Sequence, residues 1–157
     1  MARAEQWFLD DMTVGTVYPG ADKPISEADF RAFAQMTGDD HPIHYDETYA
    51  KQSRFGGRVA HGLLLMAHTA LGASVLSRHL EDSMIAFVSQ DCRFLKPVLV
   101  GDHVRAELEV AEVSPKRGRD FGVLRFKVRL FNQRGETVLD GHHEYLFKLR
   151  PAGARRP

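Results

Sequence analysis

The feature that most constrains the fold is a change in hydrophobic pattern near residue 82. Before it, residues 62–80 are apolar around almost the whole circumference of a helix, which is typical of a helix buried on all sides. After it, apolar and polar side chains alternate, which indicates strands with one buried face. The alternation predicts four long strands, at residues 84–100, 104–113, 121–131 and 137–149. Because the turns between them are short, we expect an antiparallel α+β fold in which one sheet wraps around a long central helix.

The length of 157 residues suits one compact domain, and no linker or internal repeat divides the chain. We expect a single domain over residues 1–157, with its core at about 12–149 and a C-terminal tail at 150–157. The formal net charge is zero, which disfavours electrostatic capture of nucleic acid or of an anionic membrane. Residues 1–7 hold no apolar signal segment, and no stretch is long enough to span a membrane, so we expect a cytoplasmic protein.

Two short helices are expected in the first half of the chain. Ser26, with an acid three residues later, forms a capping-box pattern at the start of the first helix, and Gly38 is a usual residue at a helix end. The second helix is expected at about residues 46–52. Between them, Pro42 removes an amide donor and disfavours helical geometry before it, so residues 38–44 are expected to be irregular.

This irregular segment carries the residue pair best suited to chemistry. Asp39 and His44 lie on a loop, where reactive groups are usually placed on a rigid scaffold. An imidazole titrates near neutral pH and a carboxylate can orient a water, so the two could work as a general acid–base pair. The same residues could instead be plain turn formers and polar loop residues. They could also ligate a metal together with His41, but this is a small ligand set, and we expect no metal.

The segment MTGDDHPIHYD at residues 36–46 resembles the hydratase motif of MaoC-like dehydratases and R-specific enoyl-CoA hydratases. That motif reads Gly-Asp-any-Asn-Pro-aliphatic-His-any-Asp/Glu. One position differs, because His41 stands where the family has Asn. The resemblance covers most of residues 12–149, and it continues in VAHGLL at 59–64, RFLKPV at 93–98 and Gly101-Asp102.

The resemblance implies a hot-dog fold, in which a long helix is wrapped by an antiparallel sheet. It also implies a hydro-lyase that adds water to a 2-enoyl-CoA to give a 3-hydroxyacyl-CoA of R configuration. On this basis Asp39 and His44 activate the water, and His41, Pro42 and His61 bind substrate or support the loop. The family further implies a homodimer with the acyl-CoA tunnel near its interface, and no cofactor besides the thioester substrate.

Gly62 begins the expected central helix. A helix N-terminus offers free amides and a positive dipole end, which suit the negative charge that develops on a thioester oxygen. Gly62 matches the family's position for this donor, so the resemblance assigns its backbone N–H to the oxyanion hole. The alternative is that glycine is needed here only for close packing.

Other residues have simpler interpretations. His68 lies within the apolar helix and is expected to be a hydrogen-bonded core histidine. His142 and His143 alternate on a strand, so one should face inward and the other should face water. Cys92, the sole cysteine, is expected to be a strand residue and not a nucleophile. Basic candidates for contact with the CoA nucleotide, for each of which a solvated charge is the simpler reading, are Lys96, Lys116, Arg117 and Arg119.

Two other functions suit the same fold. Several hot-dog thioesterases and acyl-carrier-protein dehydratases carry a carboxylate inside the central helix, whereas residues 62–80 contain none. A non-catalytic acyl-CoA-binding protein would keep the tunnel without needing Asp39 and His44. Product analysis separates these classes, because hydration yields a hydroxyacyl-CoA without releasing free thiol.

Overall fold

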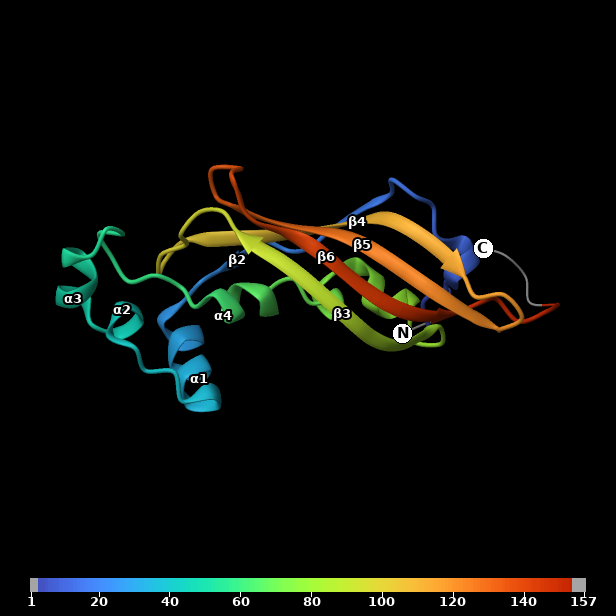
Figure 1. The fold of residues 1–157 in the computed structure, drawn as a ribbon, viewed down its shortest axis with the longest axis horizontal. Coiled ribbons are helices and arrows are strands. Elements are labelled where there is room, and N and C mark those ends of the chain that lie inside the picture. The colour runs from blue at the N-terminus through green and yellow to red at the C-terminus, as the bar shows by residue number, and fades with distance from the viewer. Residues whose placement is uncertain (1–2, 154–157) are drawn as a thin grey trace.

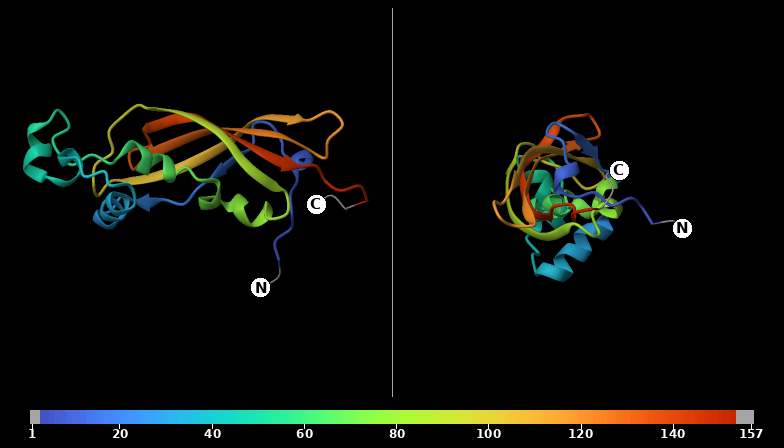
Figure 2. Two further views of the ribbon diagram at one scale, coloured as in Figure 1. Left: turned by 60° about the horizontal axis from the view of Figure 1, so that its bottom comes forward. Right: turned by 90° about the vertical axis from the view of Figure 1, so that its right-hand side faces the viewer.

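The computed structural model describes residues 3–153, so residues 1–2 and the end of the expected tail, 154–157, lie outside the described range. Within that range the chain forms one six-stranded sheet and several short helices (Figure 1). The end-on view in Figure 2 shows the sheet curving around the helical segments that follow residue 61. The expected antiparallel sheet around a central helical element is confirmed.

The sheet has the spatial order β1-β4-β5-β6-β3, with β2 also paired to β4, and its pairings are antiparallel. Every second residue of β5 is buried along the whole strand, as the sequence alternation predicts. The strands are β1 (Val17–Pro19), β2 (Lys23–Pro24), β3 (Met84–Phe94), β4 (His103–Pro115), β5 (Phe121–Asn132) and β6 (Thr137–Lys148).

The first of the four long strands is shorter than predicted. It ends at Phe94 and not near residue 100, because Pro97 has no amide to donate to a ladder. The chain instead forms a loop in which the Val98 carbonyl accepts the Ala60 amide at 2.7 Å. This loop therefore lies beside the segment that leads into the central helix.

The central helix is not continuous, which corrects the prediction of one helix over about 62–80. It divides into α4 (Gly62–Ala67) and two short 3-10 turns, η2 (Leu71–Ala73) and η3 (Val75–His79). The breaks occur where the backbone becomes extended, with ψ of 134° at Ala70 and 170° at Ser74. Both hydroxyl residues there bond locally: Thr69 donates to the Met66 carbonyl at 2.6 Å, and Ser74 accepts the Leu76 amide at 3.2 Å. Such local bonds compete with helical hydrogen bonding.

Three helices, α1 (Glu27–Thr37), α2 (Pro42–Tyr45) and α3 (Glu47–Gln52), lie beyond one end of the sheet (Figure 1). The predicted capping box is confirmed, because Ser26 accepts the Asp29 amide and the Asp29 carboxylate accepts the Ser26 amide. The prediction of an irregular segment at 38–44 is wrong in part, since Pro42 begins α2. A proline is tolerated at the first position of a helix, where its missing amide would have had no partner.

The expected tail is anchored at its first residue. The amide of Arg150 donates to the Asp10 carboxylate at 2.8 Å, and its guanidinium pairs with Asp11. The side chains of Arg150 and Asp11 are both 9% exposed, so this contact belongs to the packed body of the protein. The core thus extends to either side of the predicted limits of 12–149.

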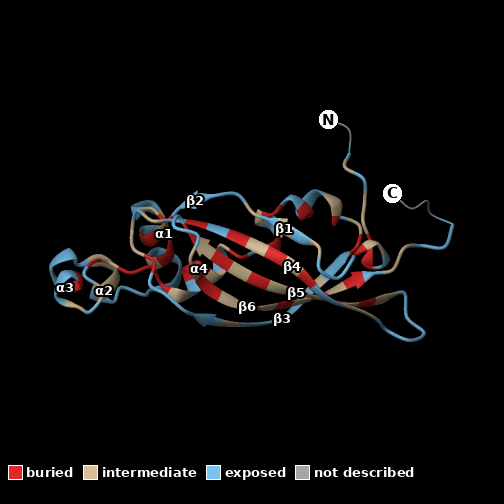
Figure 3. Ribbon diagram, turned by 90° about the horizontal axis from the view of Figure 1, so that it is seen from above, coloured by how far each residue is buried: buried red, intermediate tan, exposed pale blue. Residues whose placement is uncertain are grey.

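The inner face of β4, β5 and β6 forms most of the core, and it packs against the helical segments and the residues before β1 (Figure 3). Phe30, Phe126 and Phe147 are fully buried. The edge strand β3 differs, because most of its residues are exposed. Its large apolar residues and the one that follows it are 46–56% exposed: Met84, Ile85, Phe87, Val88, Phe94 and Leu95. No helix within residues 3–153 has both the length and the apolar character to cross a membrane.

Candidate active site

His44 is held so that one ring nitrogen stays available. Its Nδ1 lies 2.6 Å from the Val59 carbonyl oxygen, which can only accept a hydrogen bond. Nδ1 therefore carries the hydrogen, and Nε2 keeps the lone pair that can take a proton. The strand-like segment at Val59 fixes this geometry through its bridge to Leu99.

Asp39 follows the glycine that ends α1. Gly38 has a φ of 75°, the left-handed conformation that commonly closes a helix and turns the chain. Asp39 is exposed, and its carboxylate accepts the His41 amide at 3.3 Å. The turn thereby places Asp39 beside His44, as the sequence predicts.

The structure adds His61 to this pair. Three atoms come together here: one ring nitrogen of His44, one ring nitrogen of His61 and one carboxylate oxygen of Asp39. All three lie within 4.8 Å of one another. A single water could bridge groups at that separation, because two hydrogen bonds of about 2.8 Å each span up to roughly 5.5 Å. Asp39 and His44 thus lie close enough to act on one water.

His61 lies beneath His44 as a buried, oriented ring. It is 3% exposed, and the two rings stack with centroids 3.7 Å apart and an interplanar angle of 27°. Phe33 packs on the ring at 4.5 Å and Phe30 at 5.4 Å. Burial lowers the pKa of His61, and the neighbouring His44 lowers it further, while Asp39 opposes the shift. A neutral His61 under His44 is the consequence.

Tyr45 orients His61, a role that the sequence did not reveal. Its hydroxyl lies 2.8 Å from His61 Nε2 and 3.1 Å from the Phe30 carbonyl oxygen. When the hydroxyl donates to the carbonyl, it accepts from His61, which puts the hydrogen of His61 on Nε2. Tyr45 follows His44 directly in the motif, but it reaches a residue 16 positions away, a contact that spacing alone does not show.

His41, which replaces the family's Asn, caps α2. Its Nδ1 accepts the Ile43 amide at 3.2 Å, so it supports the loop from outside the cluster. The metal set weighed from the sequence, Asp39, His41 and His44, is therefore not the set that the fold gathers. The observed group of Asp39, His44 and His61 fits a metal poorly, because nearly parallel stacked rings do not direct their lone pairs to one point.

Gly62 begins α4 and lines a cavity of about 300 Å³ at the end of β3. A Cβ at residue 62 would lie 2.9 Å from the ring of Phe94, so the structure gives glycine a packing reason at this position. The cavity is lined by Arg54, Phe55, Val59, Ala60, Gly62, Leu65, Phe94, Leu95, Lys96, Pro97 and Val98. Gly62 thus joins the Asp39 loop, through His61, to a space large enough for part of a ligand.

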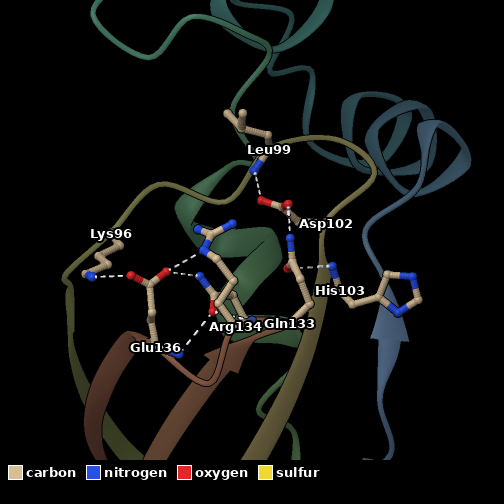
Figure 4. Close-up of polar contacts among 8 residues, drawn as sticks. Lys96, Leu99, Asp102, His103, Gln133, Arg134 and Glu136 are labelled. Atoms are coloured by element: carbon tan, nitrogen blue, oxygen red, sulfur yellow. Dashed lines mark hydrogen bonds and ion pairs between the residues drawn. The ribbon is translucent and has the colours of Figure 1, made fainter.

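The basic residues considered for the nucleotide lie at opposite ends of the molecule. Lys96 borders the cavity beside Gly62, whereas Lys116, Arg117 and Arg119 lie in the β4–β5 turn (Figure 1). Lys96 pairs with Glu136 at 2.6 Å (Figure 4). Hydrogen bonds from Asn132, Lys96 and Arg134 lower the pKa of Glu136 to about 2. Among the four, only Lys96 lies on a cavity next to the cluster.

The Gly101-Asp102 pair of the resemblance has a structural role. The Asp102 carboxylate accepts the Leu99 amide at 2.8 Å and a hydrogen bond from Gln133 at 2.5 Å (Figure 4). Gly101 adopts a φ of 92°, which favours glycine. The pair thus holds the loop after β3 against the β5–β6 turn.

Residues 11–128 match the family model described as MaoC like domain. The chain belongs to this family. It is 40% identical over 113 residues to the 3-hydroxybutyryl-CoA dehydratase of Methylorubrum extorquens, an alignment that covers 71% of this chain and 69% of the relative. It is 30% identical over 119 residues to the (R)-specific enoyl-CoA hydratase of Aeromonas caviae, covering 76% and 84% of the two chains.

The solved structures support the same assignment. A protein from Archaeoglobus, described as a monoamine oxidase regulatory protein, superposes with a TM-score of 0.88 at 32% identity. That superposition covers 96% of this chain and 100% of the other. The hot-dog fold expected from the motifs is confirmed.

Proposed function

We propose that this MaoC-like protein is a hydro-lyase that reversibly adds water to a 2-enoyl-CoA to give an (R)-3-hydroxyacyl-CoA. The observation that carries the proposal is the placement of Asp39 and His44 within bridging distance of one water, with His44 Nε2 free to accept a proton. Relatives named as an R-specific hydratase and a dehydratase support the reaction class.

The chemistry follows from the tautomer of His44. Nε2 and the Asp39 carboxylate together remove a proton from the bound water as its oxygen attacks the β-carbon. The electron pair of the alkene moves toward the thioester oxygen, and a proton then returns to the α-carbon, so the water is added in full. The negative charge on the thioester oxygen needs a donor placed in advance, and we assign the Gly62 amide to it.

Neutral His61 serves as support for this step. A ring without charge, stacked on His44, lets His44 become an imidazolium without a second positive charge beneath it. His41 and Pro42 hold the loop through the start of α2. We propose that all three position Asp39 and His44, and that the site needs no metal or further cofactor.

We further propose that two copies pair through β3. An edge strand with exposed apolar residues is a site for strand pairing, and a second copy would cover it. Leu63, 63% exposed on α4, would be covered by the same partner. Light scattering tests this, because Val88→Lys should yield a monomer, while Lys127→Ala on β5, which β6 separates from the β3 edge, should not. A wild-type monomer at micromolar concentration would contradict it.

The reaction is tested with crotonyl-CoA. Hydration removes the absorbance of the conjugated thioester without releasing free thiol, and chiral analysis of the product gives its configuration. Asp39→Asn and His44→Ala should lower the activity by about 10²-fold or more in folded protein, whereas Asp40→Asn, next to the site, should retain it. Free CoA as the product would instead show a thioesterase. Binding without turnover would show an acyl-CoA-binding protein. Since CoA thioesters are intracellular metabolites, the proposed place of action is the cytoplasm.

A further inference from the structure

A second cavity, of about 420 Å³, lies between the broken central helix and strands β3 and β6. It begins at Leu63, the residue after the proposed oxyanion donor, and runs along one side of α4 toward η2. Its walls are mostly apolar, but they include two buried polar residues of β6. The lining residues are Leu63, Met66, Ala67, Ala70, Leu71, Gly72, Met84, Phe87, Gln90, His143 and Tyr145.

The buried polar residues form a chain that fixes their hydrogen positions. Thr69 already donates its hydroxyl hydrogen to the Met66 carbonyl at 2.6 Å, so it can only accept from His143 Nε2, 3.4 Å away. His143 Nδ1 is then an acceptor for the Tyr145 hydroxyl, also at 3.4 Å. Both contacts are long for hydrogen bonds, so the two ring nitrogens of His143 are only weakly hydrogen-bonded.

This group carries no charge at neutral pH. Burial lowers the pKa of His143 to about 4, with Asp91 opposing the shift. Burial likewise raises the pKa of Tyr145 to about 12, although a hydrogen bond with the Leu71 backbone opposes this rise. His143 is 5% exposed and Tyr145 4%. The cavity therefore presents a neutral donor and a neutral acceptor inside an apolar lining.

We propose that this cavity receives the far part of the acyl chain and that His143 and Tyr145 select a chain bearing a distal hydroxyl. The inference rests on the proposed hydration of an enoyl-CoA. A hydroxyl is both a donor and an acceptor, which matches a neutral imidazole beside a phenol. A carboxylate would be buried without a positive partner, and a plain alkyl end would leave His143 with only its two contacts of 3.4 Å.

The spacing along α4 sets the chain length. The six residues of α4 rise about 9 Å from Gly62, and Thr69, which contacts His143, follows just after the helix end, so the group lies on the order of 10 Å from the proposed oxyanion donor. An extended chain advances about 1.2 Å per bond, as an extended backbone does, so the hydroxyl should be about eight carbons from the thioester. A four-carbon acyl group would not reach it.

The test compares oct-2-enoyl-CoA with its ω-hydroxy derivative. The ratio of kcat/KM for the hydroxylated over the plain substrate should favour the hydroxylated one in the wild type and fall about tenfold in His143→Leu. Tyr145→Phe should lower the ratio by less. His142→Leu is the matched control, because the neighbouring residue points to the other face of β6 and should leave the ratio unchanged.

Two further measurements separate the possible failures. Crotonyl-CoA turnover should change less than about threefold in these variants, since a short chain does not reach His143. Calorimetric binding of ω-hydroxyoctanoyl-CoA against octanoyl-CoA reads the preference without any reaction. An equal ratio in the wild type and in both variants, with normal crotonyl-CoA turnover, overturns the inference alone. Absence of turnover on every enoyl-CoA overturns the proposed function, while the binding preference still tests the cavity. If His143→Leu does not fold, Tyr145→Phe decides the result.

Discussion

Two histidine–tyrosine pairs lie along the central helical element, and they differ in what surrounds them. His61 and Tyr45 meet at 2.8 Å at the start of α4, next to His44 and an exposed carboxylate. His143 and Tyr145 meet at 3.4 Å inside the sheet, where the walls are apolar. We propose that the same two side chains serve different purposes: beside a carboxylate and solvent they support proton transfer, whereas in an apolar cavity they provide fixed polarity. The environment determines the role more than the residue type does.

The largest effect should come from removing His44, the proposed base beside the His61–Tyr45 pair. His44→Ala should lower kcat/KM for crotonyl-CoA by about 10²–10⁴-fold, the usual contribution of general acid–base catalysis. His143→Ala should have little effect on this short substrate. Steady-state kinetics on folded variants measures both. Equal losses in the two variants would erase the proposed difference between the regions.

Protonation of His143, in the second pair, should cause most of the loss of stability as the pH falls below 6.5. The pKa of His143 is lowered from 6.5 to about 4, so the folded state binds the proton less readily than the unfolded chain does. Its contribution to the free energy of unfolding is constant above pH 6.5 and changes as the pH falls from 6.5 to about 4, destabilising the fold by up to about 3 kcal/mol. Urea unfolding of wild type and His143→Leu across this range measures it. Parallel pH profiles would contradict the lowered pKa.

An intermediate effect is expected at the junction between the regions. In Gly62→Ala the new methyl group would lie 2.9 Å from the Phe94 ring, so the ring or the helix start must shift. We expect kcat/KM to fall about tenfold, because a small displacement of a donor weakens oxyanion stabilisation. Phe94→Leu in the same chain should restore part of the loss. If the double variant is no better than Gly62→Ala, contact with the ring is not the cause.

The smallest effect should come from the two phenols, which form a matched pair. Tyr45→Phe removes the hydroxyl that orients His61, and a net hydrogen-bond loss of about 1 kcal/mol corresponds to roughly fivefold in crotonyl-CoA kcat/KM. Tyr145→Phe should leave this quantity unchanged, because crotonyl-CoA does not reach the second cavity. A fivefold loss in Tyr145→Phe alone would reverse the assignment.

Local sequence signals predicted much of this structure. Ser26 and Gly38 mark the two ends of α1, and alternation located three of the four long strands to within two residues, because both depend on neighbours in the chain. The breaks in the central helix were missed because an apolar periodicity does not report the local bonds of Thr69 and Ser74. Pro42 was taken as a helix breaker although it can also begin a helix.

The group of Asp39, His44 and His61 was predicted only in part, because sequence spacing reports local contacts and not tertiary ones. Asp39 and His44 lie five positions apart, so one turn could bring them together, and the motif named both. The stacking of His61 on His44 and the bond from Tyr45 depend on where α4 meets the loop, which is a tertiary outcome. Of the adjacent pair His142 and His143, alternation predicted that one would face inward, and the structure identifies it as His143.

The division of the central element into α4 and two short turns separates two tasks along the chain. In the proposed function, α4 begins at the oxyanion donor Gly62, whereas Ala70, Leu71 and Gly72 of the later segment line the cavity of about 420 Å³. Since each segment begins with its own backbone geometry, substitutions in the later turns can reshape substrate preference without moving the earlier one. A protein built in this way can evolve, or be engineered, toward a new acyl group while its reaction stays the same.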